Sequence, residues 1–323
     1  MSFKLVKLAL PVLSALSLWA VAIAPAVAQT GPIKLIVGFP PGGSADAIAR
    51  AVADRAAATL GVTVVVENKP GAGGRIAAEF LKNAPADGNT VLITPLAPVV
   101  IAPLTFRKLP YYPAEDFVPV AHLAKFHLMI ATGGSSPHKT LGELVAWFKA
   151  NPSKANFGTA AAGSQLHFLG VMLGQAIGVE LTHVPYQGGA PLNNDIMGGQ
   201  IPAGIDTLAV ELHKAGKMRM LAVSGETRSS LASDVPTFKE QGFPTVVGEG
   251  WMGAYMHAKT PSAMVAKISA ALADAARQPD VKQRVEGVGL EPTGLRAPEF
   301  AAIVAADRAR WKPVVEASGF KGD

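Results

Sequence analysis

The fold class can be inferred from one short segment near the start of the chain, Ile33-Lys34-Leu35-Ile36-Val37-Gly38-Phe39-Pro40-Pro41-Gly42-Gly43-Ser44. Its first seven residues are mostly apolar or β-branched and predict a short strand. The prolines and glycines end that strand, and Ser44, predicted as the N-cap, opens a helix that runs to about Leu60 and ends at Gly61. Asp46 falls in the first turn of the helix, where a negative charge is favoured. A strand that passes through small residues directly into a helix is typical of an α/β sheet.

The same junction recurs in the middle of the chain. A strand predicted over Asn156–Thr159 runs into Ala160-Ala161-Ala162-Gly163-Ser164, and a helix follows to about Ile177. The N–H groups that begin a helix bind anions without a cationic side chain, and small residues let a ligand approach the backbone. Ligands of open α/β sheets lie beyond the carboxyl ends of the strands. Two such junctions that share one cleft would hold a carboxylate from both sides; the alternative is two ordinary turns with ordinary caps.

The order of the elements predicts two α/β domains. Strands alternate with helices, a Pro-rich segment from Pro95 to Pro119 interrupts them, and a second α/β unit follows. A long strand predicted over Val246–Met256 returns the chain to the first unit. The predicted fold class is therefore α/β, with a doubly wound mixed sheet and flanking helices in each domain. The predicted division assigns residues 29–124 plus 246–323 to the first domain and 125–245 to the second, with the ligand cleft between them.

Residues 1–28 have the pattern of a secretory signal peptide. Lys4 and Lys7 form the positive start, Leu8 to Ile23 form the apolar middle, and Ala26-Val27-Ala28 is a small-x-small cleavage site. An uncleaved membrane anchor is the alternative, although Pro11 interrupts the apolar stretch. No later segment has the roughly 18 consecutive apolar residues that span a bilayer. We therefore expect an exported protein whose mature form carries no membrane span.

Composition excludes several classes of function. The 323 residues include no Cys, so disulfides, thiolate metal sites and a Cys nucleophile are excluded. The formal charge of +5 falls to +3 without Lys4 and Lys7, and the basic residues are scattered, which argues against nucleic-acid binding. The seven His show no metal-binding spacing, and Ile76 breaks the dinucleotide fingerprint suggested by Gly71-Ala72-Gly73-Gly74. We expect neither a metal nor a cofactor.

An ordered series of short motifs covers nearly the whole mature chain. The series resembles the receptors of tripartite tricarboxylate transporters, the Bug family of substrate-binding proteins. The motifs are Leu35 to Asp46, Val64 to Gly74, Ala86-Asp87-Gly88-Asn89-Thr90, Leu109-Pro110-Tyr111, His183-Val184-Pro185-Tyr186-Gln187-Gly188, Asp234-Val235-Pro236-Thr237, Gly250-Trp251 and Trp311-Lys312-Pro313-Val314-Val315.

The resemblance implies a type II-like periplasmic binding protein of a Gram-negative bacterium. Such a protein is a monomer that closes its cleft on a mono-, di- or aromatic carboxylate, delivers it to membrane permease subunits and catalyses no reaction. Carried over residue by residue, the ligand-binding positions implied are Phe39, Pro40, Pro41, Gly42, Gly43, Ser44, Asp46, Thr94, Pro95, Ala160, Ala162, Gly163, Ser164, Gln165, His167, Tyr186, Gln187, Asp206 and Thr207.

The chain departs from the family pattern at two loops. Many relatives carry Gly, Ser or Thr where this chain has Pro95 and Leu96, and the loop Ala160-Ala161-Ala162 lacks the polar residues often found there. Both departures predict a less polar ligand, either aromatic or longer.

Several residues have competing interpretations. Asp46 and Asp206 are either ligand contacts or helix-start groups, and His167 and Trp251 are either ligand contacts or packed structural residues. Two other functions also remain: a sensor that presents its closed form to a membrane sensor kinase, and an exported hydrolase that uses a serine such as Ser164.

Overall fold

The computed structural model describes residues 31–322, and the predicted signal peptide lies outside them. The first of its two sheets has six strands in the order β11-β4-β10-β3-β1-β2. β1 is parallel to β2 and β3, whereas β10 is antiparallel to β3 and β4, so the sheet is mixed. The strands are β1 (Ile33–Val37), β2 (Val64–Asn68), β3 (Thr90–Pro95), β4 (Phe117–Phe126), β10 (Gly250–His257) and β11 (Glu291–Arg296).

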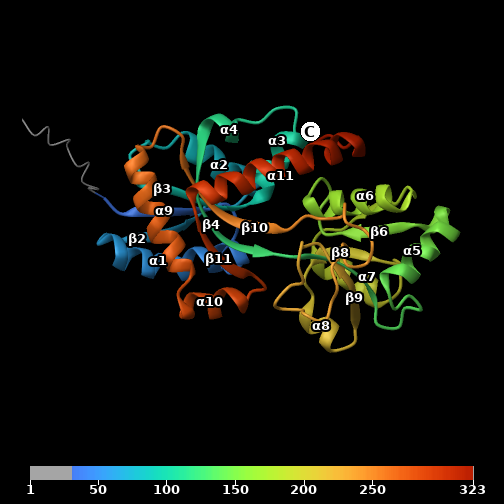
Figure 1. The fold of residues 1–323 in the computed structure, drawn as a ribbon. Coiled ribbons are helices and arrows are strands. Elements are labelled where there is room, and N and C mark those ends of the chain that lie inside the picture. The colour runs from blue at the N-terminus through green and yellow to red at the C-terminus, as the bar shows by residue number, and fades with distance from the viewer. Residues whose placement is uncertain (1–30, 323) are drawn as a thin grey trace, which may run out of the picture. The chain divides into compact units, whose positions relative to one another are not determined.

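Helices flank the first sheet in two groups (Figure 1). One group packs together and consists of α1 (Ser44–Leu60), α9 (Ser262–Ala276) and α10 (Pro279–Glu286). The other consists of η1 (Ala72–Gly74), α2 (Arg75–Lys82), η2 (Ala97–Ile101), α3 (Ala102–Thr105) and the long C-terminal α11 (Ala297–Ser318). The short α4 (Pro113–Asp116) precedes β4.

The second sheet has five strands in the order β7-β6-β8-β5-β9. It is also mixed, because β6 is parallel to β7 and β8 while β5 is antiparallel to β8 and β9. The strands are β5 (Leu128–Gly133), β6 (Asn156–Thr159), β7 (Thr182–Pro185), β8 (Gly204–Thr207) and β9 (Met218–Val223). The helices are α5 (Leu141–Ala150), η3 (Pro152–Lys154), α6 (Gln165–Ile177), α7 (Gly189–Met197) and α8 (Val210–Lys214).

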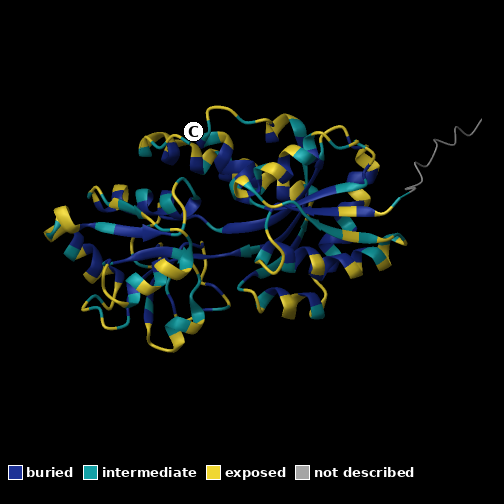
Figure 2. Cartoon of the chain, turned by 180° about the vertical axis from the view of Figure 1, so that it is seen from behind, coloured by how far each residue is buried: buried dark blue, intermediate teal, exposed yellow. Residues whose placement is uncertain are grey.

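In each of the two α/β units the strands form the buried centre, and the helices turn their exposed faces outward (Figure 2). The chain passes from β4 to β5 through His127 alone and returns through residues 224–249 to β10. Among residues 31–322, no helix combines the length and apolar character that a membrane crossing requires. The two mixed sheets with flanking helices confirm the predicted fold class, while the division into domains stays a prediction.

The structure corrects three details of the predicted elements. Gly43 rather than Ser44 is the N-cap of α1, so Ser44 is its first helical residue. β4 begins within the Pro-rich segment that interrupts the predicted elements. The register of its pairing with β10 shifts beside Pro119, as expected where a strand residue cannot donate. The sequence also failed to predict β11, where the register shifts after Pro292.

Candidate functional site

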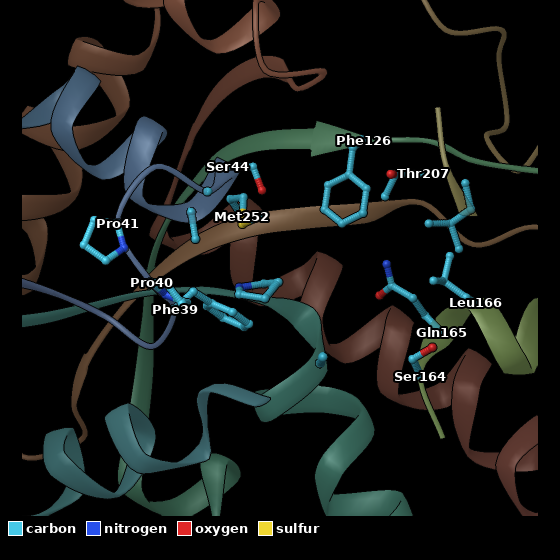
Figure 3. Close-up of a pocket in the computed structure, with 15 residues that line it drawn as sticks. Phe39, Pro40, Pro41, Ser44, Phe126, Ser164, Gln165, Leu166, Thr207 and Met252 are labelled. Carbon is cyan, nitrogen blue, oxygen red and sulfur yellow. The ribbon is translucent and has the colours of Figure 1, made fainter. Parts of the chain in front are cut away.

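A cavity of about 470 Å³ lies where the two strand–loop–helix junctions meet. The first sheet contributes the β1–α1 junction, the end of β3 and Met252 of β10, and the second sheet contributes the start of α6 and the end of β8 (Figure 3). Phe126 and Leu128 flank His127, at one crossing between the sheets. The lining residues are Phe39, Pro40, Pro41, Gly43, Ser44, Ala45, Pro95, Ala97, Phe126, Leu128, Ser164, Gln165, Leu166, Thr207 and Met252.

The first wall is the uncapped start of α1. No side chain caps Gly43, and the first backbone hydrogen bond of the helix runs from Ala47 N to Gly43 O, so the amides of residues 44–46 precede it. The Ser44 hydroxyl lies at the cavity and makes no hydrogen bond with any described residue. The wall therefore offers amide and hydroxyl donors, together with the partial positive charge of a helix start.

Asp46 anchors this wall from behind. The residue is only 3% exposed, and its carboxylate accepts hydrogen bonds from the Gly42 amide at 3.0 Å, Arg50 Nε at 2.9 Å and Asn68 Nδ2 at 2.9 Å. Asn68 Nδ2 also lies 3.0 Å from the Phe39 carbonyl oxygen. Burial on its own would raise the pKa of Asp46, but the bonds from Arg50, Gly42 and Asn68 outweigh it and lower the pKa to about 2. The carboxylate is thus charged, and its hydrogen bonds hold the Phe39–Gly43 loop in place.

The second wall is the start of α6. Ser164 is the N-cap, but its hydroxyl donates to the Ala161 carbonyl oxygen at 2.7 Å and caps no amide. The Gly163 amide donates to His167 Nδ1 at 3.3 Å, and the first helical bond runs from Phe168 N to Ser164 O. The amides of residues 165–167 precede that bond, so this helix start also keeps free donors near the cavity.

His167 supports the second wall from outside the cavity. Its ring stacks on His183 with the centroids 4.0 Å apart, and the His183 Nε2 atom lies 2.7 Å from Thr159 Oγ1. Burial lowers the pKa of both rings, and for His183, with a contribution from His167, to about 4. Phe320 packs edge-on against His167. The position of His167 therefore favours its interpretation as a structural residue.

The structure brings nine of the nineteen predicted positions to the cavity. They are Phe39, Pro40, Pro41, Gly43, Ser44, Pro95, Ser164, Gln165 and Thr207. The other ten lie behind the walls or elsewhere: Gly42, Asp46, Thr94, Ala160, Ala162, Gly163, His167, Tyr186, Gln187 and Asp206.

Three of these ten residues have contacts in the protein that place them away from the cavity. Tyr186 donates from its hydroxyl to Asp195 Oδ2 at 2.8 Å, and Thr94 is fully buried in β3. Asp206 accepts from the Thr207 amide and lines a separate cavity with α8 and residues 286–289. Burial raises the pKa of Asp206, and its bond from Thr207 opposes that rise. Trp251, the other ambiguous residue, is 2% exposed and donates from Nε1 to Asp307, so it is packed in the first sheet.

Six lining residues were missed by the sequence analysis: Ala45, Ala97, Phe126, Leu128, Leu166 and Met252. All are apolar, and most lie in or beside buried strands and helix starts where an apolar side chain is expected in any case. The sequence carries no signal that separates them from core residues. Among the described residues that line the cavity, none has a charged side chain, and within residues 31–322 no cluster of three His, Asp or Glu is arranged to hold a metal ion.

The chain is similar over most of its length to known proteins. The family model of the tripartite tricarboxylate transporter family receptor matches residues 48–320. Protein BugT of Bordetella pertussis is 31% identical over 293 residues, which cover 90% of each chain. MatC from Rhodopseudomonas palustris with bound malate has 31% identity and a TM-score of 0.73, over 89% of this chain and 99% of MatC. Another R. palustris structure, with adipate, has 30% identity and a TM-score of 0.77, over 91% and 99% of the two chains.

Proposed function

Because the chain belongs to the tripartite tricarboxylate transporter receptor family, we propose that it captures a small organic carboxylate in the 470 Å³ cavity and passes it to the permease of such a transporter. The observation that carries the proposal is the meeting of two uncapped helix starts, α1 and α6, at one cavity. Each start offers backbone amides to an anion, and neither needs a cationic side chain. Receptors of this family are periplasmic solute-binding proteins, and two similar structures contain malate and adipate.

The surroundings of Ser164 support binding without catalysis. A nucleophilic serine needs a base within hydrogen-bond reach. The Ser164 hydroxyl instead donates to a backbone carbonyl, and His167 Nδ1 accepts from the Gly163 amide. We therefore propose that the protein binds and releases its ligand unchanged.

Ligand-dependent stabilisation tests the proposed binding. The full-length gene is expressed in a Gram-negative host, and the protein is purified from the periplasm and dialysed. At a free concentration near 100 times the dissociation constant, a bound acid stabilises the folded state by about 2.7 kcal/mol, which raises the melting temperature. The panel pairs each acid with its amide, for example benzoate with benzamide and adipate with adipamide. A protein that responds to no acid, or equally to acid and amide, would contradict the proposal.

Delivery to a permease is tested in the source organism. Deletion of the gene should abolish uptake of the bound acid while the permease genes remain intact, and the intact gene supplied in trans should restore uptake. A strain that keeps its uptake and loses only the transcriptional response to the acid would instead identify a sensor.

A further inference from the structure

Gln165 is a cavity residue whose buried side-chain amide has no hydrogen-bond partner among residues 31–322. It is the first residue of α6, it is only 7% exposed, and Figure 3 shows it directed into the cavity. Its Oε1 atom is buried and has no hydrogen-bond partner among the described residues. Buried side-chain amides are nearly always paired, because an unpaired one has lost its hydrogen bonds to water without replacing them. Gln165 Nε2 is not buried in this way and also has no hydrogen-bond partner among the described residues, and a turn of the amide exchanges its two ends. The amide can therefore offer a donor or an acceptor to a group that the ligand brings.

The Gln165 amide is also held in place from behind. Gly250 lies so close that a Cβ on this residue would be 2.7 Å from Gln165 Nε2 and about 2 Å from the Phe126 ring. Glycine at position 250 thus leaves room for the amide beside Phe126. A side chain confined in this way can select ligands, since it loses little further freedom when a ligand binds.

The rest of the cavity favours an uncharged, apolar ligand body. The rings of Phe39 and Phe126 and the thioether of Met252 line it, together with three prolines. In the proposed binding mode both helix starts hold the same carboxylate. Because the described lining has no charged side chain, a second carboxylate elsewhere in the cavity would lose its water without a cationic partner. Flat rings and a thioether make favourable contacts with an aromatic ligand.

We infer that the ligand is a monocarboxylate with an aromatic or similarly apolar body and one uncharged polar substituent, which Gln165 recognises. The inference rests on the proposed function and names the ligand class of the same cavity. The carboxylate is held by the helix-start amides, and Gln165 selects among the acids that enter.

Matched pairs of acids test the inference by isothermal titration calorimetry. The probes are the three hydroxybenzoates and the hydroxyphenylacetates, benzoate and phenylacetate as their unsubstituted parents, and adipate and malate as dicarboxylates. We expect at least one hydroxylated acid to bind about three- to tenfold more tightly than its parent, as one neutral hydrogen bond allows. We also expect both dicarboxylates to bind more weakly than that acid.

Gln165→Met keeps the length of the side chain and removes the amide. We expect the ratio between the hydroxylated acid and its parent to fall to near one, while the affinity for the parent is kept. Gln175→Met on the exposed face of the same helix is the matched control and should leave every affinity unchanged. Circular dichroism confirms that each variant is folded.

Three other outcomes would contradict the ligand class, the role of Gln165 or the proposed function. If adipate or malate binds as tightly as the best aromatic acid, the inferred ligand class is wrong, but the proposed function as a carboxylate receptor is still supported. If the preference for a hydroxylated acid survives Gln165→Met, Gln165 is not the selecting residue. If no acid of the panel binds the folded protein, the proposed function fails together with the inference.

Discussion

Among single residues, the two serines beside the cavity stand one position apart relative to their helix starts and have different roles: Ser44 is the first helical residue of α1, and Ser164 is the N-cap of α6. Ser44 and Ser164 both stand at a helix start beside the cavity, but only the Ser164 hydroxyl is used within the protein, where it donates to Ala161. A hydroxyl without a protein partner is available to a ligand, whereas one that holds a loop is not. A serine beside a helix start is therefore not by that fact alone a ligand contact.

We predict that Ser44→Ala and Ser164→Ala have different effects. Ser44→Ala should weaken acid binding about tenfold, because a hydrogen bond to a charged group is lost, and should leave the melting temperature nearly unchanged. Ser164→Ala should mainly lower stability, by about 1 kcal/mol, because the loop loses its bond to Ala161. Calorimetric titration and thermal melts measure the two effects, and a larger loss of affinity in Ser164→Ala would contradict this assignment.

Asp46 is the clearest anchor of the site. Asp46→Asn removes the charge that pairs with Arg50 and replaces one acceptor oxygen by a donor, which cannot accept from the Gly42 amide. We predict a loss of about 1–3 kcal/mol in the free energy of unfolding, together with weaker acid binding as the Phe39–Gly43 loop loosens. Asp54→Asn, on the exposed face of the same helix, is the control and should change neither.

The pH dependence of this anchor follows from its lowered pKa. A carboxyl group whose folded pKa is about 2, against an ordinary value of 3.8, stabilises the fold above pH 3.8, and that contribution disappears as the pH falls toward 2. The stability difference between the native protein and Asp46→Asn should therefore shrink over that interval in urea titrations. A difference that stays constant down to pH 2 would show that the charge of Asp46 contributes nothing.

At the scale of elements, α6 is bounded by two glycines in the left-handed region with different surroundings. Gly163 has φ of +67° and Gly178 has φ of +70°. A Cβ on Gly178 would meet nothing within 4 Å, whereas one on Gly163 would lie 2.3 Å from the Phe320 ring. The second wall of the cavity is thus fixed both by backbone conformation and by the C-terminal segment that follows α11.

Substitution of the two glycines separates these contributions. We predict that Gly178→Ala costs about 1–2 kcal/mol, the strain of a left-handed alanine, and that Gly163→Ala costs more and weakens acid binding. Phe320→Ala should recover part of the loss in the double variant because it removes the clash but not the strain. Urea denaturation of the native protein, Gly163→Ala, Phe320→Ala and the double variant completes the cycle. Equal losses of stability in Gly163→Ala and Gly178→Ala would exclude a role for Phe320.

At the scale of the whole molecule, a buried polar cluster joins the two crossings between the sheets. His127 fills the first crossing, and Glu249 lies at the end of the second. His127 Nε2 lies 3.4 Å from Glu249 Oε1 and 3.3 Å from Glu291 Oε1, close contacts that are too poorly directed to be hydrogen bonds. The Ser229 hydroxyl donates to Glu291. The cluster therefore connects both crossings to β11.

Glu291 makes the stability of this cluster sensitive to acid. Burial would raise its pKa, but His127 and the Ser229 hydroxyl outweigh it and lower the pKa to about 2, from an ordinary 4.5. This contribution to stability is present above pH 4.5 and is lost as the pH falls toward 2. We predict that Glu291→Gln costs about 1–3 kcal/mol at pH 7 and that the cost shrinks across that interval. Exposed Glu316→Gln is the control, and an equal effect of both variants would contradict the prediction.

Local pattern was enough to predict most elements and the two junctions that build the site. The strand before Pro40-Pro41-Gly42-Gly43, the helix that follows and the second junction before α6 depend on residues close together in the chain, so composition and turn residues reveal them. The predicted boundaries of β6, Asn156–Thr159, agree with the structure. β4 and β11 were missed because both contain proline, and long-range pairing rather than local preference makes them strands.

An α/β fold and two helix starts able to bind an anion can thus be inferred from local sequence alone. Long-range packing brings both starts to one cavity and places Phe126, Leu128 and Met252 in its apolar wall. Long-range packing also sets the roles of two polar residues. Asp46 faces inward and anchors the first loop, whereas Gln165 faces the cavity without a partner among the described residues. The reason is physical: backbone conformation follows from near neighbours, but the surroundings of a side chain depend on segments far away in the chain that folding brings together.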